Sequence, residues 1–446
     1  MSAAQATAGR RRKSKRAATS SPEYNMMLTA TLCLLAFGAV MVFSASSTTQ
    51  VLGDGGLKNS VFFLKRTVIF GATGLLLMHL FARHGLRLIR LLTPALLAVS
   101  FFLLVAVLGV GTSVNGATRW IGSGFLQIQP SELAKVTLVL YGAHLLATKP
   151  KCARTIGGMF PYLVLTGLAC LLMVAEPDLG TAIVTSFAVA TMLVAAGARI
   201  RDLVLIAAVI AGLVLLMIAI EPYRRERLVG FLNPGADVAG SGFQALQAKI
   251  ALGSGGISGV GIGNGVQKAF YLPEAHTDMI AAVIGEEVGF VGIAGLVGLF
   301  SLFGYAGFRI AQGAKDRYGK LLVAGLTSMI LVQAVINLFA VMGMAPLTGV
   351  PLPFVSYGNS SLLVSLTAVG LILNVAKGGT ASAVGRRPAR RSAAAGSRAG
   401  KLRVVEGGRS PARGRSRSGA GKNRHSGGRD RRPRRAGHGG RRRASR

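Results

Sequence analysis

Long apolar runs, separated by short polar segments, dominate the chain between residues 23 and 377. A helix that crosses the apolar core of a bilayer needs about 17–25 mostly apolar residues, so these runs predict transmembrane helices. The pattern therefore predicts an all-α polytopic membrane protein with ten transmembrane helices. The predicted spans are 26–45, 67–81, 91–110, 131–147, 158–174, 179–196, 203–220, 279–307, 321–344 and 361–375.

The basic residues between these runs predict the orientation of the chain. With the N-terminus in the cytoplasm, the four predicted inner loops carry twelve Lys or Arg residues, and the four short outer loops carry four. Cytoplasmic loops of membrane proteins are enriched in Lys and Arg, so the count supports this direction. Ten spans then return the C-terminus to the cytoplasm.

The remaining charge is concentrated in two tails. The chain of 446 residues has 51 Lys plus Arg against 16 Asp plus Glu, a formal net charge of +35. Residues 1–22 are basic, and residues 378–446 are rich in Arg, Gly and Ser, so we predict two disordered cytoplasmic tails. The thinly charged body between them excludes an ordinary soluble enzyme and a nucleic-acid-binding protein with a basic body.

One predicted outer loop, 221–277 between the seventh and eighth spans, is much longer than the others. It is too apolar and Gly-rich to form a separate domain, but residues 243–252 have the pattern of an amphipathic helix at the membrane surface. The Gly-rich stretch 253–265 lacks the strand and helix that flank a nucleotide-binding fingerprint. Its glycines therefore indicate tight turns and close packing. A loop of this size in a compact bundle is usually functional.

Ionisable side chains close to the spans need an explanation, because charges are costly there. In the stretch 115–135 (NGATRWIGSGFLQIQPSELAK), we expect Pro130 and Ser131 to start a helix, with Ser131 as its N-cap. Glu132 and Lys135 then share one face of the first turn. Two interpretations stay open, a self-neutralising pair or a cation directed at an anionic ligand.

Two acidic residues stand at predicted outer ends of spans. Asp178, in AEPDLGTA, directly precedes the sixth span, where capping of the helix is the simplest role for an acid. Asp278, in YLPEAHTD, lies at the outer mouth of the eighth span. There, either Thr277 or Asp278 caps the helix, or the Asp278 carboxylate, beside His276, acts as a general base on a lipid-borne substrate.

Other polar residues lie inside or between the last spans. Glu286 and Glu287 are predicted to lie deep in the eighth span, protonated or paired with a cation inside the bundle. Gln333 and Asn337 are four residues apart in the ninth span, where we expect them to hydrogen-bond between helices. The segment 345–361 contains three prolines and predicts irregular backbone that lines a cavity, since such backbone cannot face lipid.

Five motifs in this order resemble those of the shape, elongation, division and sporulation (SEDS) family. They are MVFSAS (41–46), the stretch 115–135, AEPDLGTA (175–182), GVGIGNGVQKAFYLPEAHTDMIAAVIGEE (259–287) and PLTGVPLPFVSYGNSS (346–361). The resemblance covers nearly the whole membrane body. VQKAFYLPEAHTD followed by IGEE resembles the FtsW-type division branch more than the RodA-type elongation branch. Two departures are Asn359, where the family usually has glycine, and the missing lysine that some relatives carry beside Gly349.

The resemblance implies a membrane-embedded peptidoglycan glycosyltransferase in the bacterial cytoplasmic membrane. It would polymerise lipid-linked disaccharide-pentapeptide (lipid II) into glycan strands at the division septum by inverting transfer. The implied partners are this precursor, a class B penicillin-binding protein with transpeptidase activity, other division proteins and membrane lipids. We do not expect nucleic acid as a partner. The alternatives are a RodA-type polymerase of wall elongation, a flippase for the precursor, and a scaffold that recruits division proteins through its tails.

Carried over motif by motif, the resemblance makes Asp278 the catalytic base. The expected substrate-binding residues are Arg119, Trp120, Glu132, Lys135, His276, Arg224 and Arg225. Cations are expected near the leaving pyrophosphate, although arginines in an outer loop, such as Arg224 and Arg225, more often meet lipid headgroups. No cluster of metal ligands is visible in the sequence, and a divalent cation such as Mg²⁺ that bridges the pyrophosphate stays an open prediction.

Overall fold

The computed structural model describes residues 21–47, 57–84, 86–114, 117–122, 127–220, 225, 230–232 and 242–379. The chain divides into two units, Met1–Val384 and Gly385–Arg446, and every described residue lies in the first. Nearly all of the two predicted tails, 1–22 and 378–446, lies outside the described residues, so their disorder stays a prediction.

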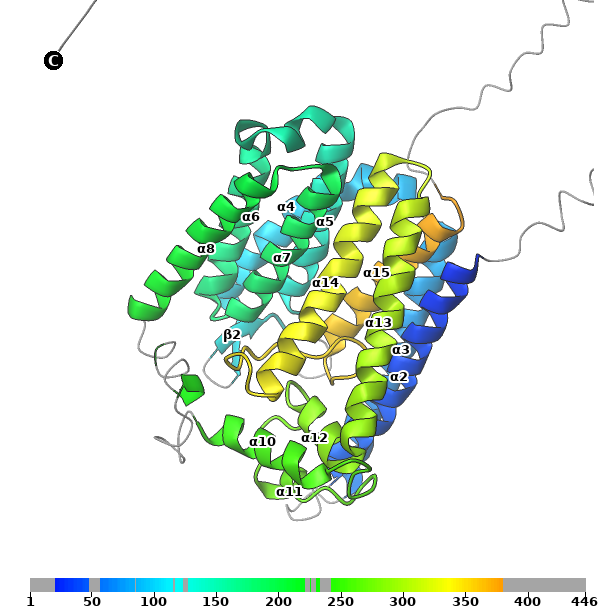
Figure 1. Ribbon diagram of the computed structural model, residues 1–446, viewed down its shortest axis with the longest axis vertical. Helices are drawn as coiled ribbons and strands as arrows, with labels where there is room; N and C mark the ends of the chain where they lie inside the picture. The colour runs from blue at the N-terminus through cyan, green and yellow to red at the C-terminus, as the bar shows by residue number, and fades with distance from the viewer. Residues whose placement is uncertain are drawn as a thin grey trace, which may run out of the picture. The chain divides into compact units, whose positions relative to one another are not determined.

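Helices make up most of the described chain (Figure 1). Within it, eight helices are long and apolar enough to cross a membrane, and they coincide with eight of the ten predicted spans. They are α2 (Pro22–Ser47), α3 (Leu57–Arg83), α4 (Leu86–Val110), α6 (Ile156–Ala175), α7 (Leu179–Ala196), α13 (Gly289–Gly313), α14 (Arg317–Val341) and α15 (Asn359–Ala376). The prediction of a polytopic helical membrane protein is confirmed.

The predicted count of ten spans is not confirmed. Two further helices, α5 (Pro130–Thr148) and α8 (Ile200–Ile220), occupy the fourth and seventh predicted spans. They are not among the eight helices that meet the criteria for crossing a membrane within the described chain. Most of α5 is buried against other helices, including its charged first turn, so protein rather than lipid surrounds it.

Close backbone contact breaks the predicted eighth span into two helices. α12 (Ile280–Glu287) ends before Gly289, where α13 begins with a positive φ of 72°. Gly259, from the Gly-rich stretch, has a φ of 78°, and a side chain on either glycine would overlap the backbone of the other segment. The expected close packing of these glycines is therefore confirmed, and it places the outer loop against the α12–α13 junction.

The two described ends of the chain lie at the same end of the helices. Lys377, after α15, has its Nζ 5.0 Å from the ring centre of Tyr24 in α2. The short helix η1 (Pro150–Arg154), which carries two of the predicted inner basic residues, also lies at this end, uppermost in Figure 1. By the positive-inside rule, this end faces the cytoplasm, and the chain crosses the membrane an even number of times.

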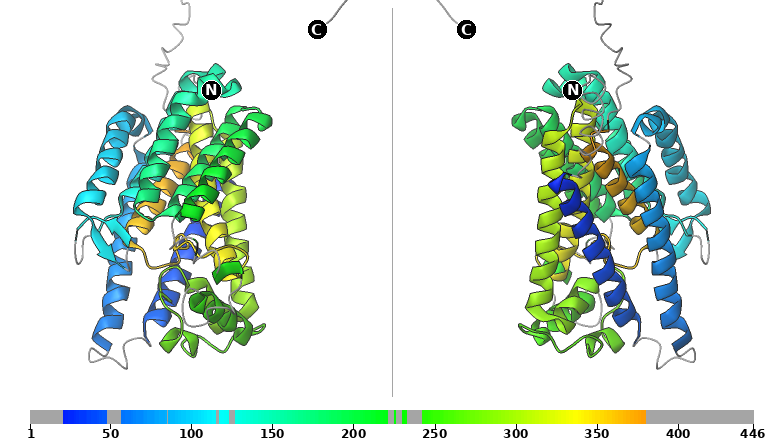
Figure 2. Two further views of the ribbon diagram at one scale, coloured as in Figure 1. Left: turned by 90° about the vertical axis from the view of Figure 1, so that its left-hand side faces the viewer. Right: turned by 90° about the vertical axis from the view of Figure 1, so that its right-hand side faces the viewer.

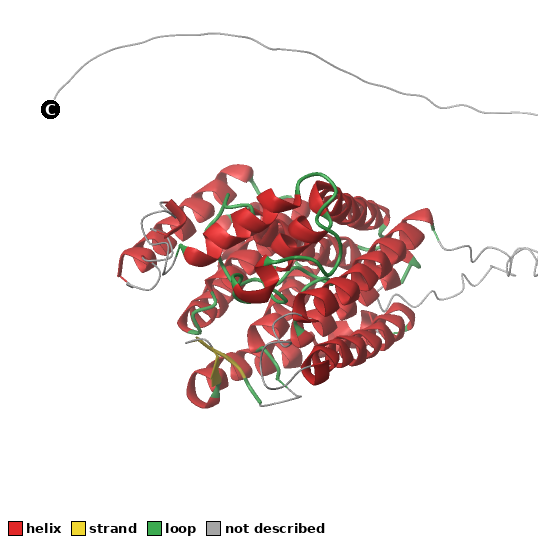
Figure 3. Ribbon diagram, turned by 90° about the horizontal axis from the view of Figure 1, so that it is seen from below, coloured by secondary structure: helices red, strands yellow, loops and turns green. Residues whose placement is uncertain are grey.

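The short elements lie in the half of the molecule away from the cytoplasmic end (Figure 1). β1 (Thr112–Val114) pairs antiparallel with β2 (Ala117–Trp120), at one edge of the molecule when it is seen from the opposite end (Figure 3). The all-α prediction did not include this hairpin. α10 (Phe243–Gly255) and α11 (Gln267–Phe270) lie beyond the hairpin, at the far end of the molecule (Figure 2). α10 confirms the helix predicted at 243–252 and packs on α12.

The helix α14 lies at the centre of this arrangement. It packs against α5, α7, α13 and α15, and most of its side chains are buried. A helix that is buried on all sides is expected to be apolar all round, so its few polar residues are informative. Gln333 and Asn337 are both buried and lie in the half of α14 nearest the irregular segment 345–358.

Candidate active site

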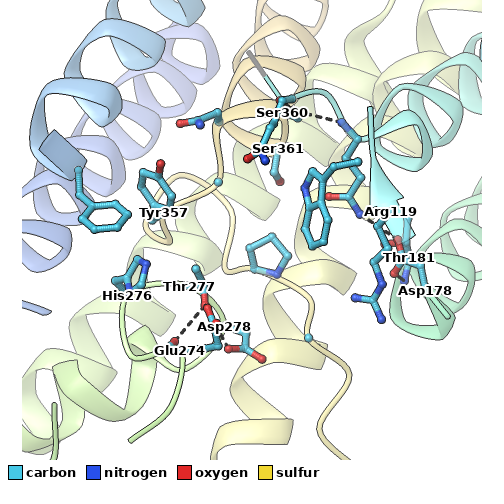
Figure 4. Close-up of a pocket in the computed structure, with 18 of the residues that line it drawn as sticks. Arg119, Asp178, Thr181, Glu274, His276, Thr277, Asp278, Tyr357, Ser360 and Ser361 are labelled. Atoms are coloured by element: carbon cyan, nitrogen blue, oxygen red, sulfur yellow. Dashed lines mark hydrogen bonds between the residues drawn. The ribbon is translucent and has the colours of Figure 1, made fainter. Parts of the chain in front are cut away.

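A cavity of about 540 Å³ lies in the half of the molecule that carries the short elements, and Figure 4 shows the residues that line it. It is lined by α3, β2, the turn between α6 and α7, the segment before α12 and the segment 345–361. Its volume is within the range of about 300–1,000 Å³ that is usual for small-molecule sites. Four of the predicted site residues line it: Arg119, Trp120, His276 and Asp278.

Asp278 lies in the turn that precedes α12, with its side chain half-buried at the cavity wall. The N-cap position of α12 is occupied by Met279, which makes no side-chain cap, so neither Thr277 nor Asp278 stands at the N-cap position. Thr277 Oγ1 instead donates to Glu274 Oε2 at 2.8 Å and lies 3.4 Å from Asp278 Oδ1. The carboxylate is therefore placed to meet a ligand in the cavity.

The side-chain amide of Asn337 fixes the backbone around Asp278. Asn337 Nδ2 donates to the Asp278 carbonyl oxygen at 2.7 Å and to the Val350 carbonyl oxygen at 2.8 Å. A single amide thereby joins the turn that carries Asp278 to the segment 345–358. The prediction that Asn337 hydrogen-bonds between helices is wrong, because both of its acceptors are backbone carbonyls of non-helical segments at the cavity.

Arg119 and Trp120 reach the cavity from β2. The Arg119 guanidinium is held by two carbonyl oxygens, with Nε donating to Glu176 at 3.3 Å and Nη2 donating to Pro177. Carbonyl acceptors orient a guanidinium without neutralising its charge. Arg119 therefore keeps a positive charge that can bind a carboxylate or a phosphate through its remaining N–H groups.

Asp178 connects α7 with the start of α5. Its Oδ1 accepts from the Thr181 backbone N–H at 3.2 Å, which confirms the predicted N-cap of α7. Its Oδ2 accepts from Ser131 Oγ at 2.8 Å and from Gln129 Nε2 at 2.9 Å. The predicted N-cap role of Ser131 is wrong, because α5 begins one residue earlier, at Pro130, and the Ser131 hydroxyl donates to Asp178.

Glu176 is fully buried in the turn between α6 and α7, beside Arg119 and Asp178. Within the described part of the chain, neither of its carboxylate oxygens has a hydrogen-bond partner. Burial, reinforced by the charge of Asp178, raises the pKa of Glu176 to about 8, although Arg119 acts in the opposite direction. Glu176 is therefore largely protonated at neutral pH.

Glu132 and Lys135 do not line the cavity. They form a buried ion pair at 2.8 Å, and Lys135 Nζ also donates to Gln333 Oε1 at 2.8 Å. The Gln333 amide then donates from Nε2 to the Pro351 carbonyl oxygen at 2.9 Å. The pair thus supports the segment 345–358 from inside the bundle, and direct contact of Glu132 or Lys135 with a substrate stays a prediction.

An aromatic cluster forms the wall opposite Arg119 and Asp178 (Figure 4). The ring centres of Phe63 and His276 lie 4.8 Å apart, and that of Tyr357 lies 5.0 Å from Phe63 and 5.5 Å from His276. Burial lowers the pKa of His276, so its ring is neutral at physiological pH. The wall is therefore flat and mostly apolar, with polar atoms at its edges.

Several lining residues are absent from the sequence-based interpretation. Arg66 is buried and lines the cavity from α3. Its position at the outer boundary of a predicted span is a signal that could have identified it, because a cation there needs an explanation. Of the two outer-loop arginines, Arg225 is exposed and does not line the cavity, and Arg224 lies outside the described residues. Their substrate-binding roles stay predictions.

A second buried ion pair lies beside α12. Lys268 Nζ is 2.5 Å from Glu287 Oε1. Ser44 Oγ in α2 lies 2.8 and 2.7 Å from the two Glu287 oxygens and donates its one proton to this carboxylate. Glu286 accepts from two backbone N–H groups at the start of α11, at 2.7 and 3.1 Å. The prediction that one of these two acids pairs with a cation inside the bundle is confirmed, and Lys268 is the cation.

No three His, Cys, Asp or Glu side chains come together as a metal site among the residues that the structure describes. A divalent cation such as Mg²⁺, bound to the pyrophosphate of a substrate, stays a prediction.

Known proteins resemble this chain along most of its length. The family model for cell cycle proteins of the FtsW, RodA and SpoVE type matches residues 24–380. Stage V sporulation protein E of Bacillus subtilis is 41% identical over 356 residues, which cover 79% of this chain and 96% of that protein. The probable peptidoglycan glycosyltransferase FtsW of Trichlorobacter lovleyi is 40% identical over 360 residues, covering 80% and 94%.

Solved structures show the same likeness. A chain of a peptidoglycan synthase complex, described as coordinating polymerization and crosslinking, matches with a TM-score of 0.65 and 33% identity. The match covers 79% of this chain and 96% of that chain. The rod shape determining protein RodA of Thermus thermophilus matches with a TM-score of 0.58 and 30% identity, covering 79% and 95%. Both matches span a large share of the helical body that holds the cavity.

Proposed function

Because this chain belongs to the FtsW, RodA and SpoVE family and is a membrane-embedded peptidoglycan glycosyltransferase, we propose that it polymerises lipid II into glycan strands at the division septum. The observation that carries the proposal is a single cavity lined by the Asp278 carboxylate and the Arg119 guanidinium. Glycosyl transfer from a lipid pyrophosphate needs a base for the acceptor hydroxyl and positive charge for the leaving group.

In this proposal, Asp278 is the general base of a single displacement. Its carboxylate takes the proton of the 4-hydroxyl of the acceptor sugar while that oxygen attacks the anomeric carbon of the donor. The new carbon–oxygen bond forms as the bond from the anomeric carbon to the pyrophosphate oxygen breaks, and the electron pair leaves with the pyrophosphate. Attack from the face opposite the leaving group inverts the anomeric configuration.

The remaining lining residues bind and orient the two sugars. Arg119 stabilises the negative charge that develops on the pyrophosphate, and a divalent cation such as Mg²⁺ on that group would add to it. Trp120 follows Arg119 in β2 and also lines the cavity, and the wall that contains His276 and Tyr357 lies across the cavity from Arg119 (Figure 4). These rings offer flat surfaces against which sugar rings can pack.

The proposed setting is the division septum, with a class B penicillin-binding protein as the transpeptidase partner. The similarity to probable FtsW enzymes supports the septal role, and the likeness to RodA keeps wall elongation as the alternative. The similar peptidoglycan synthase complex coordinates polymerization with crosslinking, which supports a crosslinking partner for this chain as well. Other division proteins and membrane lipids complete the proposed partners.

The decisive experiment compares Asp278→Asn with Asp316→Asn, each purified with the penicillin-binding partner and supplied with lipid II. Asp278→Asn removes the base without changing the size of the side chain, so glycan polymer should fall by about 100-fold or more. Asp316 caps α14 at the cytoplasmic end, and asparagine caps helices equally well, so the control should retain wild-type activity.

Polymer formation by Asp278→Asn at the wild-type rate would show that Asp278 is not the base. If the wild-type protein makes no polymer with its partner but moves lipid II between the leaflets of vesicles, the flippase alternative replaces the proposed function.

A further inference from the structure

Gly349 separates the two charged groups of the cavity. It lies in the irregular segment 345–358 with a φ of 71°, a left-handed conformation that favours glycine. A Cβ built on Gly349 would lie 3.6 Å from Arg119 Nη1 and 4.0 Å from Asp278 Oδ2. Apart from the chain neighbours of Gly349, no other described heavy atom would lie within 4 Å of it. This glycine therefore faces an opening with the guanidinium on one side and the carboxylate on the other.

The opening has a carboxylate on one side and a guanidinium on the other, as a displacement at a sugar requires. A hydroxyl that gives its proton to Asp278 must come within about 2.6–3.2 Å of a carboxylate oxygen. An oxygen at that distance, between Asp278 and Gly349, would overlap a methyl group at the Cβ position. Only a residue without a side chain leaves room for it there.

Resting on the proposed function, we infer that the acceptor hydroxyl and the anomeric carbon of the donor meet directly over Gly349. Gly349 is then the floor of the reaction centre: it admits the acceptor oxygen to Asp278 and leaves Arg119 on the side of the departing pyrophosphate. Gly349 is a positioning residue in this scheme, because its contribution is the space above its Cα.

Two amides of α14 hold this floor in place. The Asn337 amide donates to the carbonyl oxygens of both Val350 and Asp278. One side chain thereby fixes the backbone of Val350, which follows Gly349, relative to the backbone of Asp278. The Gln333 amide, four residues earlier on the same helix, donates to the Pro351 carbonyl oxygen at 2.9 Å. With both following carbonyls anchored, the segment cannot withdraw from Asp278 to make room for a larger residue at 349.

The first test is Gly349→Ala, assayed with lipid II in complex with the penicillin-binding partner. The methyl group would be in ordinary contact with Arg119 and Asp278, so neither side chain must move, yet it occupies the path of the acceptor oxygen. Displacement of the reacting atoms by about 1 Å costs roughly 100-fold in rate, so kcat should fall by about that factor. KM for lipid II should change little, because its pyrophosphate and lipid contacts remain.

Two other glycines in the left-handed region serve as controls. Gly343 also has a φ of 71° but does not line the cavity, and its nearest neighbour is the flexible side chain of Lys249. Gly197, with a φ of 91°, caps α7 at the cytoplasmic end with nothing within 4 Å among the described residues. Gly343→Ala and Gly197→Ala should stay within about threefold of wild-type kcat, since they add a backbone cost and, at 343, only a shift of the flexible Lys249 side chain.

A second variant tests whether Gly349 matters because it leaves space for the substrate or because its backbone adopts a left-handed conformation. Asparagine tolerates the left-handed conformation better than alanine but projects a longer side chain. If Gly349 provides space, Gly349→Asn should be less active than Gly349→Ala although it is more stable to heat. If Gly349 provides only backbone freedom, the activity order is reversed, and the inference is wrong.

These experiments can contradict the inference about Gly349 without contradicting the proposed function. An inactive Asp278→Asn together with a Gly349→Ala as active as the two control variants would overturn the inference and leave the proposed function standing. An active Asp278→Asn would overturn both.

Discussion

Glu176 is a buried acid whose protonation can be followed through stability. Its ordinary pKa of 4.5 is raised to about 8 by burial. Between these two values the folded protein keeps a proton that the unfolded chain has released, so the free energy of unfolding falls as pH rises from about 4.5 to 8. Above about pH 8 this contribution no longer changes.

Glu176→Gln should remove this dependence, because the amide cannot ionise. The thermal midpoint of the wild-type protein in detergent should fall from pH 5 to pH 8, and that of the variant should change less over the same range. Parallel midpoints for the two proteins would mean that Glu176 is already ionised at low pH.

Asn337→Asp should lower the kcat of the folded protein by about tenfold or more. The change removes the two N–H donors to Asp278 and Val350 and turns a carboxylate toward their carbonyl oxygens. Asn374 offers a matched control, because its amide donates to the Phe81 carbonyl oxygen at 2.8 Å at the cytoplasmic end. Asn374→Asp should cost stability but leave kcat unchanged, and equal kcat losses in both variants would indicate a general loss of structure.

At the scale of single residues, the sequence best predicted the site residues that are polar or charged and that lie within a recognisable motif. Asp278, Arg119 and His276 were predicted as site residues, and all three line one cavity. Gly349 could not be predicted, since its role depends on a gap between two segments that are far apart in the chain. The direction of the Asn337 amide is a similar case, because only the folded structure shows which carbonyl oxygens it reaches.

At the scale of elements, the pair of Lys268 and Glu287 ties α11 to α12, and Ser44 adds α2. Removing one member of a buried ion pair leaves an uncompensated charge at a cost of about 3–5 kcal/mol, whereas removing both can be nearly neutral. Lys268→Met should therefore lower the thermal midpoint strongly. Lys268→Met with Glu287→Gln should recover most of that loss.

The measurement is a double-mutant cycle on thermal midpoints, with Glu287→Gln as the other single variant. Additive losses would indicate that Lys268 and Glu287 contribute independently, which is incompatible with the contact at 2.5 Å.

Helices were predicted well from hydropathy, and their ends and breaks were not. The predicted start of the second span at residue 67 falls well inside α3, which begins at Leu57, because the basic residues between them interrupt the apolar run. The break at Gly289 depends on contact with Gly259, thirty residues earlier, which a local window cannot detect. The β1–β2 hairpin is too short to give an alternating pattern.

At the scale of the whole molecule, catalysis should not depend on the C-terminal tail. All the residues that line the cavity lie before residue 362. A protein lacking residues 380–446 should therefore polymerise lipid II in vitro at the wild-type rate, whatever the tail binds in the cell. Loss of polymerisation by this truncated protein, with its helices intact by circular dichroism, would favour a direct role of the tail.

The walls of the cavity come from both ends of the helical body: Phe63 belongs to the second described helix and Ser361 to the last. Ribosomes deliver these segments in sequence, so a partly inserted chain has no complete pocket. The chain can therefore polymerise glycan only after α15, the last helix that lines the cavity, has entered the bilayer. A chain whose synthesis stops before α15 therefore lacks Ser361 and the rest of that wall, and it should not polymerise glycan.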